Sequence, residues 1–278
     1  MSRERERQAS MGRERERQVP LSAAEVTTIL AICAARGLLV GGQALAFWSD
    51  HLEVAPPAEL ATGITADADF VGDSALAREL GKRLGWATWV PSLDDATPQT
   101  GKVTHRVASG VKEVDFLSGV AGLTTKDIVR RAVEMDVPGI GPLRVMHPVD
   151  VLDSRIQNLH LLPEKRNPAG VAQARLALGM VRAYLRREVA ARGERSALKL
   201  LERVVEIAAD IAAVRVCLRY GIDPLEAVPL ESFRTTTALH RTRWPQIEAE
   251  VAARRDALAK VLARPRAGPA PRRAKPAR

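Results

Sequence analysis

The pattern of apolar residues changes near Pro148, and this change restricts the folds open to the chain more than any other feature. After it, apolar residues recur at helical spacing over roughly 149–161, 168–191, 195–219 and 244–262. Before it, short apolar runs alternate with helical segments and turn residues. Alternating strands and helices predict a sheet covered by helices, whereas a continuous helical pattern predicts a bundle. We therefore expect an α/β (α+β) fold, a mixed sheet flanked by helices, followed by a C-terminal helical domain.

The two ends of the chain differ in composition from its middle. Residues 1–19 hold the repeat Arg-Glu-Arg-Glu-Arg-Gln twice, and residues 264–278 are rich in Pro, Arg and Ala without apolar periodicity. Segments of this kind have too few apolar residues to build a core. We predict a disordered charged arm at 1–19, an α/β domain at 20–147, a helical domain at 148–263 and a disordered basic tail at 264–278.

Local signals place the elements of the first half. Ser22 and Glu25 form a capping-box pattern at the start of a helix. The run 38–40, Leu-Leu-Val, reads as a short buried strand that leads into Gly41-Gly42 and a second helix. Further strands are expected at 64–71, 86–90, 103–108 and 111–117, with a loop at 91–101 and a hairpin, or a turn into a short strand, at 137–145.

The charge balance suggests the kind of partner. The formal net charge is +9 and the isoelectric point is about 10.1. An excess of positive charge favours a polyanion, such as nucleic acid or a nucleotide phosphate. The alternative is that much of the excess lies in the tail and binds nothing in particular.

Several classes of protein are disfavoured by what the sequence lacks. Cys33 and Cys217 both lie on apolar helical stripes, which indicates buried free thiols and not a disulfide framework. No apolar run reaches the roughly 18 residues that a membrane span needs. The N-terminus is charged and lacks an apolar signal core. We expect a cytoplasmic protein with no membrane partner.

Three aspartates form the clearest chemical pattern. Asp67 and Asp69 are two residues apart on a predicted strand, so their side chains point to the same face. Asp115 interrupts the apolar residues of a later predicted strand. Neighbouring carboxylates repel each other unless a cation joins them. If the two strands are neighbours, the three carboxylates form a hard oxygen site suited to Mg²⁺.

The glycine pair supplies the second part of the pattern. Gly41 and Gly42 lie between a strand and a helix, where glycine allows backbone N–H groups to approach a phosphate closely. The N-terminus of the following helix adds partial positive charge at the same place. A metal on one side of a phosphate and backbone N–H groups on the other are typical of a phosphoryl-transfer site.

The order Gly-Gly, Asp-x-Asp and a third strand aspartate resembles the nucleotidyltransferase superfamily. The segments Gly41-Gly-Gln-Ala-Leu-Ala-Phe47, Thr65-Ala-Asp-Ala-Asp-Phe70 and Pro148-Val-Asp-Val-Leu-Asp-Ser-Arg155 are similar to its minimal bacterial branch, which includes AbiEii-type toxins. The resemblance covers roughly residues 22–190. It implies that residues 20–147 form a nucleotidyltransferase-like domain.

The resemblance also implies roles for individual residues. Gly41 and Gly42 match the glycines that position the triphosphate, and Gln43 follows them where family members commonly have Ser. Arg155 matches a basic residue that contacts phosphate. The metal ligands and catalytic residues would be three carboxylates that bind two Mg²⁺ ions, with the third also helping to activate the attacking hydroxyl: Asp67, Asp69 and Asp115.

The function that follows is Mg²⁺-dependent transfer of a nucleotidyl group from an NTP to a hydroxyl of RNA, of a protein or of a small molecule. A toxin-like role with an antitoxin partner is one version of it. The alternative is a non-catalytic protein of the same fold that binds a nucleotide or nucleic acid. A third hypothesis is a partner-binding protein whose basic tail anchors it to nucleic acid.

Each motif also has a simpler interpretation. Asp67 and Asp69 could lie in a surface turn, Asp115 at a sheet edge, and the glycine pair in a tight turn without a ligand. Basic residues near the end of the predicted helix 149–161 could contact a nucleotide or RNA together with Asn158, or simply face solvent: Arg155, Lys165 and Arg166.

Overall fold

The computed structural model describes residues 17–263. Most of the predicted arm and the whole predicted tail lie outside the described residues. The last three residues of the predicted arm are described: Gln18 forms a parallel bridge with Val111, and the N–H of Val19 donates to the Val111 carbonyl at 2.8 Å. The end of the segment that was predicted as an arm, residues 18 and 19, therefore pairs with the sheet.

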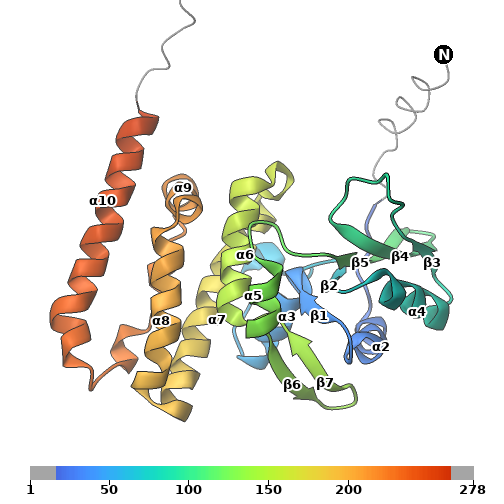
Figure 1. Ribbon diagram of the computed structural model, residues 1–278, viewed down its shortest axis with the longest axis horizontal. Helices are drawn as coiled ribbons and strands as arrows, with labels where there is room; N and C mark the ends of the chain where they lie inside the picture. Colours follow the sequence, from blue (N-terminus) through green and yellow to red (C-terminus); the bar gives the residue numbers. More distant parts are fainter. Residues whose placement is uncertain (1–16, 264–278) are drawn as a thin grey trace, which may run out of the picture.

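A mixed seven-stranded sheet occupies one end of the molecule, in the order β3-β4-β5-β2-β1-β7-β6 (Figure 1). Strand β2 runs parallel to β5, β1 runs parallel to β7, and the other neighbours are antiparallel. This confirms the predicted mixed sheet. The strands are β1 (Leu38–Val40), β2 (Ala68–Val71), β3 (Ala87–Trp89), β4 (Gln99–Val107), β5 (Gly110–Leu117), β6 (Val133–Val137) and β7 (Gly141–Val145).

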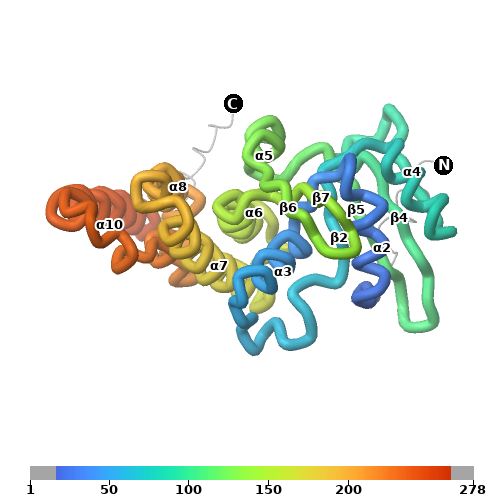
Figure 2. Tube along the Cα trace, turned by 90° about the horizontal axis from the view of Figure 1, so that it is seen from below, coloured from blue at the N-terminus to red at the C-terminus, as the bar shows by residue number. Residues whose placement is uncertain are grey.

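Helices flank the sheet and then continue away from it as a helical region, as predicted. Figure 2 shows α7, α8 and α10 following one another away from the sheet. The helices near the sheet are α2 (Ala23–Cys33), α3 (Gly41–His51), α4 (Ser74–Leu84) and α5 (Thr125–Arg131). The later ones are α6 (Pro148–Leu161), α7 (Pro168–Arg192), α8 (Glu194–Ala209), α9 (Ile211–Tyr220) and α10 (Trp244–Leu262).

Three strands differ from the sequence-based prediction. Strand β2 begins at Ala68, so residues 64–67 form a bend and not the first half of a strand. Strand β4 begins at Gln99 because its first residues pair with the end of β5, and the predicted loop at 91–101 is accordingly shorter. The predicted hairpin at 137–145 is present, but its first strand, β6, begins earlier, at Val133.

The long helix predicted at 195–219 is two helices, α8 and α9. Asp210 separates them with an extended backbone, and its carboxylate accepts a hydrogen bond from the N–H of Ala212 at 2.7 Å. This side chain satisfies one of the N–H groups that have no partner at a helix start. The chain therefore changes direction at Asp210, although the apolar periodicity continues through it.

One continuous apolar core joins the sheet to the helical region. Trp48 of α3 is fully buried, and its indole N–H donates to the Met146 carbonyl at 2.8 Å. The Trp48 ring also meets the Tyr184 ring of α7 edge to face, with centroids 5.8 Å apart. The start of the helix after the glycine pair is thus held against both the sheet and the long helix α7.

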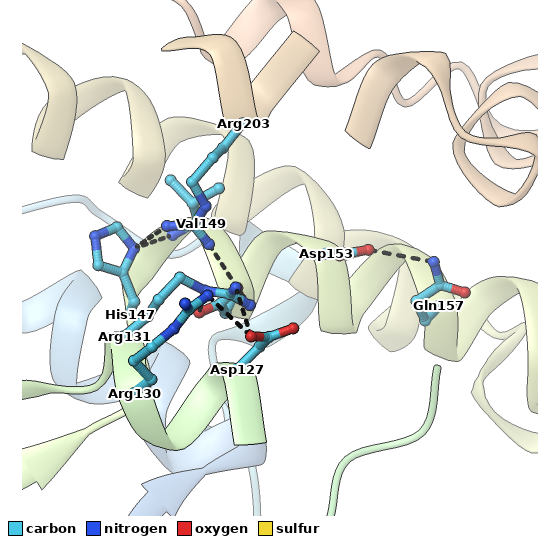
Figure 3. A network of polar contacts seen from close by, with 9 residues as sticks. Asp127, Arg130, Arg131, His147, Val149, Asp153, Gln157 and Arg203 are labelled. Atoms are coloured by element: carbon cyan, nitrogen blue, oxygen red, sulfur yellow. Dashed lines mark hydrogen bonds and ion pairs between the residues drawn. The ribbon is translucent and has the colours of Figure 1, made fainter. Parts of the chain in front are cut away.

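A buried ionic cluster fixes the start of α6 (Figure 3). Asp150 is only 2% exposed and accepts two hydrogen bonds from Arg131 of α5, at 2.9 and 3.0 Å. Arg203 of α8 donates to the same carboxylate at 2.6 Å. A buried carboxylate needs such charged donors to offset its lost hydration. Three helices therefore meet at one side chain of α6, the helix that also carries Arg155.

Two further observations concern the cysteines and the possibility of a membrane-spanning helix. Cys33 is buried and Cys217 is partly buried, and both are free thiols, as predicted. Within residues 17–263, no helix combines the length and the apolar character that crossing a bilayer requires.

Candidate functional site

The register of three neighbouring strands assembles the acidic residues. Asp69 on β2 lies beside Val40 of β1 on one side and beside Asp115 of β5 on the other. Asp67 was predicted to lie on this strand, but it is in the bend immediately before β2. Each of the three carboxylates offers an oxygen, and these oxygens all lie within 4.8 Å of one another. The structure thus brings the three predicted aspartates together, and Asp115 is not at a sheet edge.

Neighbouring polar side chains hold two of these carboxylates in place. The Thr65 hydroxyl donates to Oδ1 of Asp67, and the Gln18 amide donates to its Oδ2 at 3.1 Å. On the other side, Oδ1 of Asp115 accepts from the Gln99 amide at 2.7 Å, and the Lys102 ammonium lies 3.3 Å from the same oxygen.

These four supporting residues were not among the predicted site residues. Gln18 belonged to the excluded arm and Gln99 to a predicted loop. Lys102 reaches Asp115 only because the two are directly opposite in the antiparallel pairing of β4 with β5. Thr65 had a detectable signal, since its hydroxyl is two residues from Asp67 in a motif already singled out.

The electrostatics of the site favour a bound cation. Burial, together with the charges of Asp67 and Asp115, raises the pKa of Asp69 to about 7. Burial also raises the pKa of Asp115, against the opposing effect of Lys102. Close carboxylates with raised pKa values are costly to keep ionised together, and a divalent ion relieves that cost.

The glycine pair lies directly against the acidic residues. Gly41 has a φ of +66°, and a Cβ built on it would lie 2.0 Å from Oδ2 of Asp69. A Cβ on Gly42 would lie 2.5 Å from Cβ of Thr65. Only glycine allows the start of α3 to approach the carboxylates this closely. Val40 supplies no side-chain cap, so this helix start is open to an external acceptor.

Arg155 contributes an unusual positive charge to the same site. Its side chain is buried, and Nη1 and Nη2 donate to Gln173 and Ser154 at 3.2 and 3.1 Å. Its Nε has no partner in the part of the chain that the structure describes. Burial lowers the pKa of Arg155, whereas the charges of Asp69 and Asp67 raise it. No carboxylate within 17–263 forms an ion pair with it, which leaves it available to an anion.

These groups share one cavity of about 540 Å³. This volume is in the range of small-molecule sites. Its polar lining includes the acidic residues, the two glycines, Arg155, Asn158 and Lys165, and its apolar lining includes Pro98, Leu117, Val120, Ala121, Leu123 and Leu162. Gln43, the remaining predicted nucleotide-binding residue, is half-buried and is not part of this lining. A cavity lined by acidic, basic and apolar residues suits an organic phosphate with its counter-ion.

Comparison with known proteins assigns no family. No protein-family model matches the chain, and no curated protein matches it. Among solved structures, the Megavirus polyadenylate synthase matches with a TM-score of 0.35 and 10% identity, over 60% of this chain and 36% of the viral protein. JHP933 from Helicobacter pylori matches with a TM-score of 0.33 and 12% identity, over 87% of this chain and 99% of that protein. Likenesses this weak define neither the family nor the activity.

Proposed function

We propose that this protein is a nucleotidyltransferase that transfers a nucleotidyl group from an NTP to a hydroxyl acceptor. The observation that carries the proposal is the meeting of three carboxylates, their oxygens within 4.8 Å of one another, beside an open helix start and a buried, unpaired arginine. Acidic groups and phosphate-binding groups in one cavity are what a metal–NTP complex requires.

The residues fit magnesium. The donor set consists only of carboxylate oxygens, which Mg²⁺ prefers, and Asp67, Asp69 and Asp115 would hold it. When bound, the metal supplies charge neutralisation at the phosphates. The raised pKa of Asp69, about 7, is the physical sign that the site is unfavourable without a cation.

The protein groups would divide the remaining work. The N–H groups at the start of α3 and the Arg155 guanidinium would bind phosphate oxygens and orient the triphosphate. The acceptor oxygen forms a bond to the α-phosphorus while the bond from that phosphorus to the β-phosphate bridging oxygen breaks, and pyrophosphate leaves. The hydroxyl proton passes to Asp115, whose Oδ2 receives no hydrogen bond from the described residues, whereas its Oδ1 is held by Gln99 and Lys102.

The predicted division of the chain gives each part a role. Residues 20–147 would supply the catalytic sheet, and residues 148–263 would supply the opposite wall through Arg155, Asn158 and Lys165. The apolar residues of the lining would accept the base.

A transfer assay with a site variant tests the proposal. Incubation with labelled NTPs and acceptors should give product with magnesium and none without it. Asp67→Asn should lower the rate by at least about 100-fold, because it removes a metal ligand and a full charge. Asp136→Asn, an exposed aspartate on β6, is the matched control and should retain full activity. Undiminished transfer by Asp67→Asn would remove the proposed site.

One observation favours a second function, nucleotide or nucleic-acid binding without turnover. The Lys102 ammonium lies between Asp115 and Glu113, at 3.3 and 3.2 Å, and already neutralises part of the acidic charge. Calorimetry would then show NTP binding without pyrophosphate release.

The resemblance to AbiEii-type toxins adds a narrower proposal, a toxin-like role with RNA as acceptor and an antitoxin as partner. Expression should then arrest growth, and Asp67→Asn should relieve the arrest. Growth arrest that persists in the variant would argue against this role.

A further inference from the structure

A second cavity of about 510 Å³ lies between the end of α6, α9 and the end of α10. We call it the basic groove. No aspartate or glutamate lines it. Its lining is Leu159, His160, Arg166, Arg215, Val216, Leu218, Arg219, Tyr220 and Leu262.

The arginines of the basic groove have no acidic partners. Arg166, Arg215 and Arg219 are exposed, and none forms an ion pair with a carboxylate within residues 17–263. Some arginines elsewhere do have such partners: Arg182 and Arg186 both bind Glu231. The basic groove, by contrast, carries three positive charges that no carboxylate of the described residues neutralises.

The positive charges of the groove also lower the pKa of a neighbouring side chain, His160. Burial and the charges of Arg215 and Arg166 lower the pKa of His160, and only Asp210 opposes them. His160 is therefore neutral at physiological pH. The fixed charge of the groove comes from its arginines alone.

Two of the three guanidinium groups are held in position. Arg166 donates from Nε to the Leu159 carbonyl at 3.0 Å and from Nη2 to the His160 carbonyl. The Arg219 guanidinium lies over the Tyr220 ring, 5.3 Å from its centroid. Held in this way, they lose less side-chain entropy on binding an anion.

The basic groove shares a wall with the candidate active site. Along α6, Asn158 lines the active-site cavity while the next two residues line the groove. At the end of the short 3₁₀ turn Pro163–Lys165, Lys165 lines the active-site cavity and the next residue, Arg166, lines the groove. Figure 1 shows α6 and α9 near each other at the same end of the helical region, and the two helices are in contact. A chain lying in the groove could continue over this wall toward the three carboxylates.

We propose that the basic groove binds the phosphodiester backbone of a single-stranded nucleic acid and directs its terminal hydroxyl into the active site. This inference rests on the proposed function for the acceptor role. That hydroxyl would attack the α-phosphorus of the bound NTP, pyrophosphate would leave, and the strand would gain one nucleotide.

The groove suits nucleic acid better than an acidic protein segment. Arg215 and Arg219 are four residues apart on α9, so they lie one above the other along one helix face. Exposed apolar surface adjoins them at Leu218 and Leu262, and such surface accepts sugars and bases. After Leu262 the sequence continues with the basic residues Arg264, Arg266, Arg272, Arg273, Lys275 and Arg278 and no acidic one.

Fluorescence anisotropy with the full chain tests the proposal, using labelled single-stranded RNA and DNA oligonucleotides without NTP or metal. The double variant Arg215→Gln/Arg219→Gln should bind about tenfold more weakly at low salt. The slope of log affinity against log salt should fall by roughly 1.4, about 0.7 for each lost phosphate contact. Equal loss for RNA and DNA would show that the backbone is recognised, and a loss confined to RNA would assign the groove to RNA.

Arg195→Gln/Lys199→Gln is the matched control. It removes the same charge from exposed positions in the first turns of α8, the end of that helix remote from α9, and should change neither affinity nor slope. Unaltered affinity and slope in the Arg215/Arg219 variant would overturn the proposal. So would a loss of binding to polyglutamate with nucleic-acid binding intact, since this would assign the groove to an acidic protein.

The two levels of proposal fail separately. The affinity for Mg²⁺–NTP should be equal in the groove variant and the unaltered protein, because the groove is outside the nucleotide cavity. The groove variant could lose nucleic-acid affinity while the unaltered protein transfers no nucleotide. This result would contradict nucleotidyl transfer and support nucleic-acid binding by the groove.

Discussion

The position of the Asp69 side chain is fixed by the start of α3 and by the pairing of β2 with its neighbours, and its pKa is set by burial and the nearby carboxylates. Its Oδ2 occupies the space that a side chain on Gly41 would need, and its pKa is about 7. The glycine and the aspartate therefore depend on each other. A change at the glycine should be felt in stability and in ligand binding together.

Gly41→Ala tests this dependence. The added Cβ has to displace Asp69 in addition to adopting a positive φ, so the substitution should lower the free energy of unfolding by more than about 3 kcal/mol and remove Mg²⁺-dependent NTP binding. Gly139→Ala is the matched control: its φ is +77° and no atom lies within 4 Å of the added Cβ. It should cost only about 1 kcal/mol. Equal costs in urea denaturation, with NTP binding intact, would contradict this account.

At the residue scale, the site residues that belong to a short motif could be predicted from the sequence. Asp67 and Asp69 were recognisable because they follow a glycine pair and precede a third aspartate on a predicted strand. Lys102 and Gln99 were not recognisable, because their approach to Asp115 depends on pairing between β4 and β5. Gln43 was predicted because it follows the glycines, but it is not part of the cavity lining.

At the scale of elements, an ion pair ties the first helix to the sheet. Lys112 of β5 donates to both carboxylate oxygens of Glu25 on α2 at 2.7 Å, and the Ser22 N–H donates to one of them at the same distance. Burial alone would raise the pKa of Glu25, but Lys112 and Ser22 outweigh it and lower the pKa to about 2 from its ordinary 4.5.

This pair should stabilise the protein in a pH-dependent way. Because the pKa of Glu25 is lower in the folded state, its contribution is fully present above pH 4.5 and is lost as the pH falls from there toward 2. Glu25→Gln should cost about 1–2 kcal/mol at pH 7, allowing for solvent screening of a partly exposed pair, and progressively less below pH 4.5. Chemical denaturation at several pH values measures this, with the exposed Glu134→Gln as control. A cost that does not change with pH would rule out the ion pair as its source.

Helix ends were predictable where the chain marks them with capping residues. Asn167 caps α7 by accepting from the Gly170 N–H at 2.8 Å, and α7 ends at Arg192 with Gly193 as its C-cap, as the sequence suggested. The break at Asp210 was missed because an aspartate is compatible with either a helix interior or a cap. Only the packing of α8 and α9 against their neighbours decides between them.

At the scale of the whole molecule, the buried cluster around Asp150 links α5, beside the sheet, with α6 and α8 of the helical region. Asp150→Asn would leave Arg131 and Arg203 facing each other without a full counter-charge. It should lower the free energy of unfolding by about 3–5 kcal/mol. Thermal and urea unfolding both measure this cost.

Asp153→Asn, on the same helix, is the matched control. Burial raises the pKa of Asp153 to about 6, so its charge is unfavourable in the folded protein. An asparagine can still accept the hydrogen bond from Gln157. This variant should therefore be neutral or slightly more stable, and a larger loss than that of Asp150→Asn would contradict the assigned role of the cluster.

The overall architecture was predictable in outline, as a mixed sheet followed by helices, because the apolar period changes along the chain. The order of strands and the faces by which helices pack depend on contacts between distant residues, such as Trp48 with Met146 and Tyr184. A single sequence does not display such contacts. The boundary near residue 147 stays a prediction, and one apolar core runs across it.

The central claim is that the acidic site transfers the α-phosphoryl group of an NTP together with its nucleoside. Parallel reactions with α-labelled and γ-labelled NTP, magnesium and a single-stranded RNA acceptor test it directly. We predict that the α-label enters the acceptor, that the γ-label is released as pyrophosphate, and that Asp67→Asn slows both by at least about 100-fold. Entry of the γ-label into the acceptor, or no transfer of either label with any acceptor tried, would contradict it.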